Sequence, residues 1–93
     1  MIKSVKDTET KLIWTGDRSR KLPVDMQQRA QRRMKLLDAA QSLDELGELP
    51  GNRLHALKDD RAGQYSISIN MQWRICFEWK DGDAYDVEIT DYH

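Results

Sequence analysis

Residues 65–90, YSISINMQWRICFEWKDGDAYDVEIT, contain three runs in which apolar and polar side chains alternate. The runs are 65–69, 73–79 and 85–89, with short polar stretches between them. Because successive side chains of a β-strand point to opposite faces, a period of two predicts strands with one buried face. Asp81 and Gly82 supply the positive φ angles of a tight hairpin turn. The stretch therefore predicts an antiparallel meander.

The alternation also predicts which side chains share a face of the sheet. We expect these residues to face the core: Trp73, Ile75, Phe77, Trp79, Tyr85, Val87 and Ile89. We expect these to face the open side: Arg74, Cys76, Glu78, Asp86, Glu88, Thr90 and Tyr92. An open, polar sheet face is a suitable seat for a single-stranded polynucleotide. If Arg74 projects from it, Arg74→Ala should impair function far more than folding.

The residues before this meander follow a helical period. From Val24 to about Gln41, apolar side chains recur at spacings of three and four and predict a stripe buried against the sheet. The stripe consists of Met26, Ala30, Met34, Leu37 and Ala40. Pro23 suits the first turn of this helix, where a missing N–H does no harm.

Shorter elements complete the expected fold. Residues 8–14 predict a first helix capped by Asp7 or Thr8, and 43–49 predict one further helical turn. Residues 2–5 and 54–57 each predict a short strand. Helices followed by a meander predict an α+β fold in which two N-terminal helices pack on an antiparallel β-sheet.

Length and composition narrow the class of protein. The chain has 93 residues, so we expect a single domain over residues 1–93. With 39% hydrophobic and 33% charged residues, a folded, water-soluble protein is expected. There is no apolar run of about 20 residues for a membrane span and no apolar signal segment at the start. The single Cys76 requires no oxidising compartment, and a cytoplasmic location is expected.

The net charge of −1 conceals an uneven distribution. The last strand is acidic, whereas residues 18–35 are strongly basic. The basic side chains are Arg18, Arg20, Lys21, Arg29, Arg32, Arg33 and Lys35. Such a stretch can follow a phosphate backbone or dock an acidic partner, and it can equally be a solvated helix face.

The side chains that carry chemistry are those needed to cleave RNA without a metal or cofactor. The substrate's own 2′-hydroxyl is the nucleophile, so the protein must supply a base, an acid and cations for the phosphate. Histidine suits proton transfer because its ordinary pKa, about 6.5, lies near cellular pH. The candidate residues are His55, Lys58, Arg74, Tyr92 and His93. Metal hydrolysis is disfavoured, because the two histidines and the cysteine have no recognised ligand spacing.

Each candidate also has an ordinary structural interpretation. His55 can be a half-buried strand residue, and Lys58 and Arg74 can be surface cations. Tyr92 can be a strand-end aromatic, and His93 can belong to a frayed terminus. Composition and periodicity leave these alternatives open.

Several segments together resemble the HigB toxins of the RelE/ParE superfamily. They are Asn52-Arg53-Leu54-His55-Ala56-Leu57-Lys58-Asp59-Asp60-Arg61, the run 65–69, Trp73-Arg74-Ile75 and the ending Asp91-Tyr92-His93. The resemblance covers essentially the whole chain. One departure is Ala56, where a proline is common in the family.

The resemblance implies a RelE-like fold of the microbial-ribonuclease type and a ribosome-dependent endoribonuclease that cuts mRNA in the A site. It implies that His93 acts as general acid or base, with His55 as its partner or as a transition-state stabiliser. It places Lys58 and Arg74 on the scissile phosphate and Tyr92 against the nucleotide. The basic residues Arg18, Arg20, Lys21, Arg29, Arg32 and Arg33 would then face ribosomal RNA.

The implied protein partner is a HigA-type antitoxin with a helix-turn-helix fold, through which the pair would bind operator DNA. Two other functions stay open, because a shared fold does not determine activity. One is a ParE-like toxin that inhibits DNA gyrase without cutting RNA. The other is a non-catalytic protein-binding module.

Overall fold

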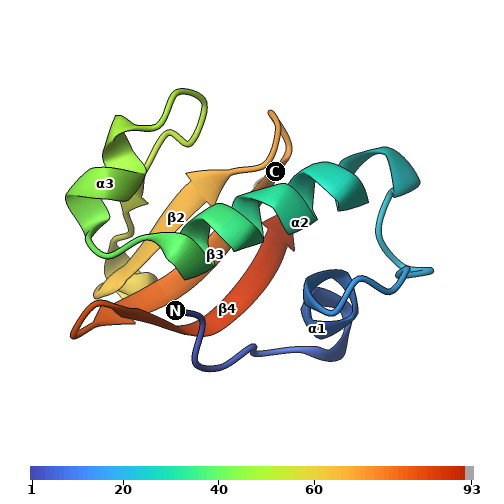
Figure 1. Cartoon of the computed structure of the whole chain (residues 1–93), viewed down its shortest axis with the longest axis horizontal. Helices are drawn as coiled ribbons and strands as arrows, with labels where there is room; N and C mark the ends of the chain where they lie inside the picture. The colour runs from blue at the N-terminus through green and yellow to red at the C-terminus, as the bar shows by residue number, and fades with distance from the viewer. Residues whose placement is uncertain (92–93) are drawn as a thin grey trace.

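The architecture is an antiparallel sheet with helices packed against it, seen in a computed structural model that describes residues 1–91. In chain order the elements are α1 (Thr8–Trp14), α2 (Val24–Ala39), α3 (Leu43–Glu48), β1 (His55–Ala56), the 3₁₀ turn η1 (Asp59–Arg61), β2 (Gln64–Ser68), β3 (Trp73–Lys80) and β4 (Asp83–Asp91). The strands form one sheet in the order β1-β2-β3-β4. Helix α2 lies across one face of this sheet (Figure 1). The predicted α+β class is confirmed.

The core lies between α2 and the covered face of the sheet. Met26 and Ala30 of the predicted stripe are 2% and 0% exposed, and the stripe's other members are buried with them. They belong to one hydrophobic cluster with Ile75 and Phe77 of β3. The stripe and its burial are confirmed, whereas Pro23 is the N-cap of α2 rather than a residue of its first turn.

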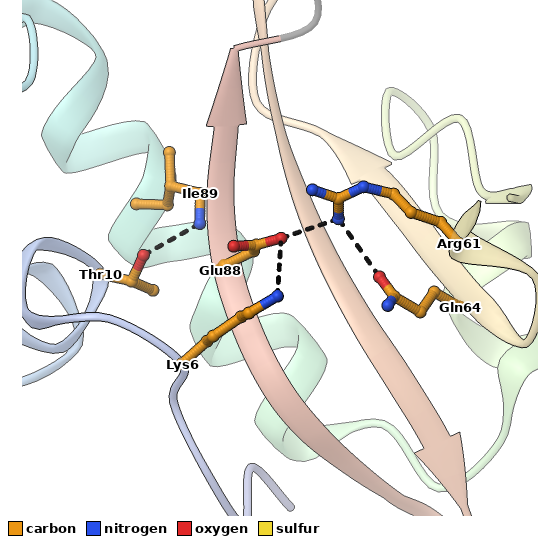
Figure 2. Close-up of polar contacts among 6 residues, drawn as sticks. All are labelled: Lys6, Thr10, Arg61, Gln64, Glu88 and Ile89. Atoms are coloured by element: carbon orange, nitrogen blue, oxygen red, sulfur yellow. Dashed lines mark hydrogen bonds and ion pairs between the residues drawn. The ribbon is translucent and has the colours of Figure 1, made fainter.

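The outer edge of β4 is covered by the beginning of the chain. Residues 2–5 form only isolated parallel bridges with β4, so the predicted N-terminal strand is shorter than expected. The Lys3 amide donates a hydrogen bond to the Ala84 carbonyl at 2.8 Å. Further along, the Ile89 amide donates to Thr10 Oγ1 of α1 at 2.9 Å (Figure 2). These contacts satisfy backbone groups that an uncovered edge strand would leave unpaired.

A β-bulge changes the faces of β4, and the prediction that Tyr85 faces the core is wrong. The register between β3 and β4 shifts just before Glu78, and Asp86 adopts a left-handed conformation with φ of 50°. Tyr85 therefore pairs with Glu78 on the open face. Ala84 and Val87, both 0% exposed, occupy the core positions on either side of the bulge. One extra residue in a strand reverses the inward and outward alternation beyond it.

Candidate active site

The first strand of the sheet positions two of the predicted site residues. His55 pairs with Ser66 of β2, so both side chains belong to the open face of the sheet. The Leu57 amide donates to the Gln64 carbonyl at 2.8 Å and holds the chain in place as β1 ends. Lys58 follows immediately, and both His55 and Lys58 are exposed. β1 itself is shorter than the predicted strand at 54–57.

A hollow of about 440 Å³ lies where this segment meets β3. It is lined by His55, Ala56, Leu57, Lys58, Asp59, Arg61 and Arg74. We call it the first hollow. The structure thus brings His55, Lys58 and Arg74 together, although they come from separate parts of the chain. The predicted residues Tyr92 and His93 lie outside the described residues. β4 leads towards them past Thr90, which pairs with Arg74.

Arg74 lies on the predicted face, but it is not the exposed cation that the alternation suggested. It is only 8% exposed. Its Nε donates to Ser66 Oγ at 2.8 Å and its Nη2 to the Ser66 carbonyl at 3.3 Å. Nη2 also donates to the carbonyl of Arg53, just before β1. The guanidinium is therefore held in one orientation by β2 and by the segment that leads to His55, and it contributes to folding as well as to the hollow.

Arg61 is a cation of the same hollow that the sequence reasoning missed. Its Nη1 donates to Glu88 Oε1 at 2.7 Å and to Gln64 Oε1 at 3.2 Å. Glu88 Oε1 also lies 3.8 Å from Lys6 Nζ, so one carboxylate on β4 holds two cations from distant segments (Figure 2). The sequence signal was its place at the end of the segment from Asn52 to Arg61 that resembles the HigB toxins, three residues after Lys58.

The predicted basic residues do not form a single group. Arg18, Arg20 and Lys21 lie in the connection between α1 and α2 and are exposed, as Arg32 on α2 is. Arg33 is half-buried, and its Nη1 donates to Asn52 Oδ1 at 2.7 Å. Together with Arg29 it lines a second hollow, on the α2 side of the molecule.

The first hollow combines fixed guanidinium groups with an imidazole and an ammonium at its rim. Preorganised cations of this kind stabilise a negatively charged phosphate oxygen, and an imidazole can transfer a proton beside it. Within residues 1–91, no group of three His, Cys, Asp or Glu side chains is arranged to hold a metal ion. No helix in that range is long and apolar enough to cross a membrane.

Solved structures are similar to this chain over almost its whole length. The fold is similar to that of a YafQ mutant from E. coli, with a TM-score of 0.58 and 13% identity over 99% of this chain and 94% of that one. It is also similar to the YoeB dimer from Staphylococcus aureus, with a TM-score of 0.55 and 21% identity over 99% and 97%. At these identities the likeness shows the fold alone.

Two curated relatives are much closer in sequence. Endoribonuclease HigB from Proteus vulgaris is 38% identical over 100% of both chains. Toxin HigB-1 from Vibrio cholerae serotype O1 is 39% identical over 72% of this chain and 70% of its own length. The family model for HigB-like toxins, described as RelE-like toxins of the type II toxin–antitoxin system HigB, matches residues 3–93. The resemblance inferred from the motifs is confirmed, and the chain belongs to the HigB-like toxin family.

Proposed function

We propose that residues 1–93 form a single toxin domain that is an endoribonuclease, cutting mRNA on the ribosome and thereby stopping translation. Family membership and the name of the Proteus vulgaris relative support the activity class. The observation that carries the proposal is the convergence of His55, Lys58, Arg61 and Arg74 around the first hollow. Such a set of side chains binds a phosphodiester and transfers protons beside it without a cofactor.

The proposed reaction is an internal transesterification. A base removes the proton from the substrate's 2′-hydroxyl, and the resulting 2′-oxygen attacks the adjacent phosphorus. The bond from phosphorus to the 5′-oxygen breaks as an acid protonates that oxygen. The products are a 2′,3′-cyclic phosphate and a free 5′-hydroxyl, so atoms and charges balance without a metal. Arg74 and Lys58 stabilise the extra negative charge of the transition state, and Arg61 adds a further cation.

The acid and base roles go to the two histidines. In this proposal His93 acts as general acid or base, and His55 is its partner or stabilises the transition state. Tyr92 packs on the nucleotide and orients it, as aromatic side chains commonly do with unpaired bases. The position of β4 supports these assignments, because this strand passes Arg74 at Thr90 and leads directly to Tyr92 and His93.

The macromolecular partners follow from the same proposal. The exposed cations Arg18, Arg20, Lys21 and Arg32 would contact ribosomal RNA phosphates, which lets a chain of net charge −1 bind a ribosome. A HigA-type antitoxin with a helix-turn-helix fold would neutralise the toxin. Operator DNA would be bound through that antitoxin.

The test is to map mRNA 5′ ends during translation, in cells and in a purified translation system. The unaltered chain is compared with Lys58→Ala and His93→Ala. Lys80→Ala is the matched control, because Lys80 is also an exposed lysine but lies beside the β3–β4 turn and does not line the first hollow. We expect codon-phased cuts with the unaltered chain and with Lys80→Ala, and a strong loss with the other two variants.

Each alternative function predicts a different result. Growth arrest with intact mRNA and induced DNA damage would identify a gyrase inhibitor. No toxicity and no cleavage would indicate a binding module. Cuts that persist at full rate in both Lys58→Ala and His93→Ala would contradict the proposed site even if the activity is correct.

A further inference from the structure

A second hollow of about 270 Å³ lies between α2 and the connection from β2 to β3. It is lined by Arg29, Arg33, Gly51, Arg53, Ser68, Ile69, Asn70 and Met71. Its charged side chains are thus all arginines, supplied by α2 and by the turn before β1. Such a hollow attracts a polyanion, because its lining contains no carboxylate that would repel one.

The guanidinium of Arg33 is held in this hollow by a fully buried side chain. Asn52 is 0% exposed, and its Oδ1 accepts from Arg33 Nη1 at 2.7 Å. Its Nδ2 donates to the Leu46 carbonyl of α3 at 3.0 Å, which prevents the amide from turning. A buried amide with both of its ends occupied is a rigid support. Arg33 is therefore oriented before any ligand arrives.

Gly51 completes the seat of the Arg33 side chain. It has a φ of 84°, and a Cβ added there would lie 3.0 Å from Arg33 Nη2. The backbone conformation of this position favours glycine, and any side chain there would press on the guanidinium of Arg33. The position of the Arg33 guanidinium is therefore determined by the turn at Gly51 and by the buried Asn52.

The second hollow adjoins the first. The carbonyl of Arg53, which lines the second hollow, accepts a hydrogen bond from Nη2 of Arg74, which lines the first. Ser68 of the second hollow pairs with Arg74 across β2 and β3. The two hollows therefore meet at the contact between Arg53 and Arg74.

One side chain of the second hollow is apolar and almost fully exposed. Met71 is 93% exposed and stands in the connection between β2 and β3. A flexible, polarisable thioether adapts to flat partners of varied shape, as methionine does on many binding surfaces. Arginines for phosphates beside an adaptable apolar side chain for a base match the two chemical parts of a nucleotide.

We propose that the second hollow is a binding subsite for single-stranded RNA, which holds the phosphodiester backbone next to the one in the first hollow. This inference rests on the proposed function and assigns Arg29 and Arg33 to the substrate strand. It separates them from Arg32 on the same helix, which lines neither hollow. The subsite adds affinity for RNA and does not take part in the bond-breaking step.

The test measures RNA binding by the full chain without the ribosome. The probe is a fluorescein-labelled 2′-O-methyl RNA of about 10 nucleotides, which spans both hollows and lacks the nucleophilic hydroxyl. Arg29→Gln is compared with Lys35→Gln, because both cations are exposed on α2 and only Arg29 lines the hollow. Fluorescence anisotropy is recorded over a range of salt concentrations.

We expect Arg29→Gln to weaken binding about tenfold at low salt, which is the scale of one lost contact between charged groups. The slope of log K against log salt should fall by about 0.7, the value for one phosphate on a single strand. Lys35→Gln should leave both quantities close to those of the unaltered chain.

Equal losses in the two variants, or no binding of the long probe by the unaltered chain, would overturn the subsite. The proposed function has its own outcome, because mRNA cleavage during translation is scored separately. If the chain cuts mRNA but the two variants bind RNA equally well, the endoribonuclease proposal stands and the subsite proposal is wrong. If the chain binds RNA as expected but never cuts mRNA, only the endoribonuclease proposal is wrong.

Discussion

Replacing Arg74 tests whether its guanidinium supports the fold as well as the proposed reaction. Arg74→Ala removes the donor for Ser66 Oγ at 2.8 Å, for the Ser66 carbonyl at 3.3 Å and for the Arg53 carbonyl. A hydrogen bond to a charged group contributes about 1.5–3 kcal/mol. Water that enters the hollow can satisfy part of what is lost, so we expect a total of about 2–4 kcal/mol. In a chain of this size that is a fall in Tm of roughly 10–25 °C.

Urea denaturation followed by tryptophan fluorescence measures this loss, and an unchanged m value would show that the native and denatured states keep their compactness. Arg74→Lys is the matched variant, because it keeps the charge but offers a single point of contact in place of the planar fork. We expect it to lose about 1–2 kcal/mol of unfolding free energy. Both variants should cleave mRNA about 100-fold more slowly or worse, as when a transition-state donor is removed.

A small loss of stability in Arg74→Ala would contradict the structural role of this side chain. If the unfolding free energy of Arg74→Ala stays within about 0.5 kcal/mol of the unaltered chain, the variant behaves as an ordinary surface substitution. Arg74 would then be the exposed cation that the alternation of β3 suggested, and its hydrogen bonds to Ser66 and Arg53 would be of no consequence for folding.

Other substitutions test the bulge and the turn before β1. Ile75→Ala should lower the unfolding free energy by about 2–5 kcal/mol, because Ile75 is in the core. Tyr85→Ala should lower it clearly less, because Tyr85 is on the open face. Equal losses in urea denaturation would contradict that placement. Asp86→Gly should stabilise the protein by roughly 0.5–1 kcal/mol, since a non-glycine residue at positive φ is strained; a fall in Tm would argue against the bulge. Gly51→Ala should destabilise by about 1–2 kcal/mol through its positive φ and the crowding of Arg33, and a Tm equal to that of the unaltered chain would show that the turn can relax.

The secondary structure followed from local patterns because its periods are local properties of the chain. The alternation over 73–79 and the stripe from Met26 to Ala40 each require only the geometry of one element. Both were confirmed, with changes mainly at the ends of elements. The family could also be inferred from the sequence, because its motif is a contiguous stretch from Asn52 to Arg61 and can be recognised without the three-dimensional structure.

The site depended on contacts that no local pattern contains. Tyr85 lies on the open face because the bulge at Asp86 adds one residue to β4. Whether such a bulge is stable depends on the packing between β3 and β4, which no local pattern contains. Arg61 reaches the first hollow because Glu88, far along the chain, holds its guanidinium. Arg74 is buried because the carbonyl of Arg53 and the hydroxyl of Ser66 meet it from two other segments. The sequence by itself determined the elements and the family, and tertiary structure decided which cations converge, because convergence depends on register and long-range hydrogen bonds.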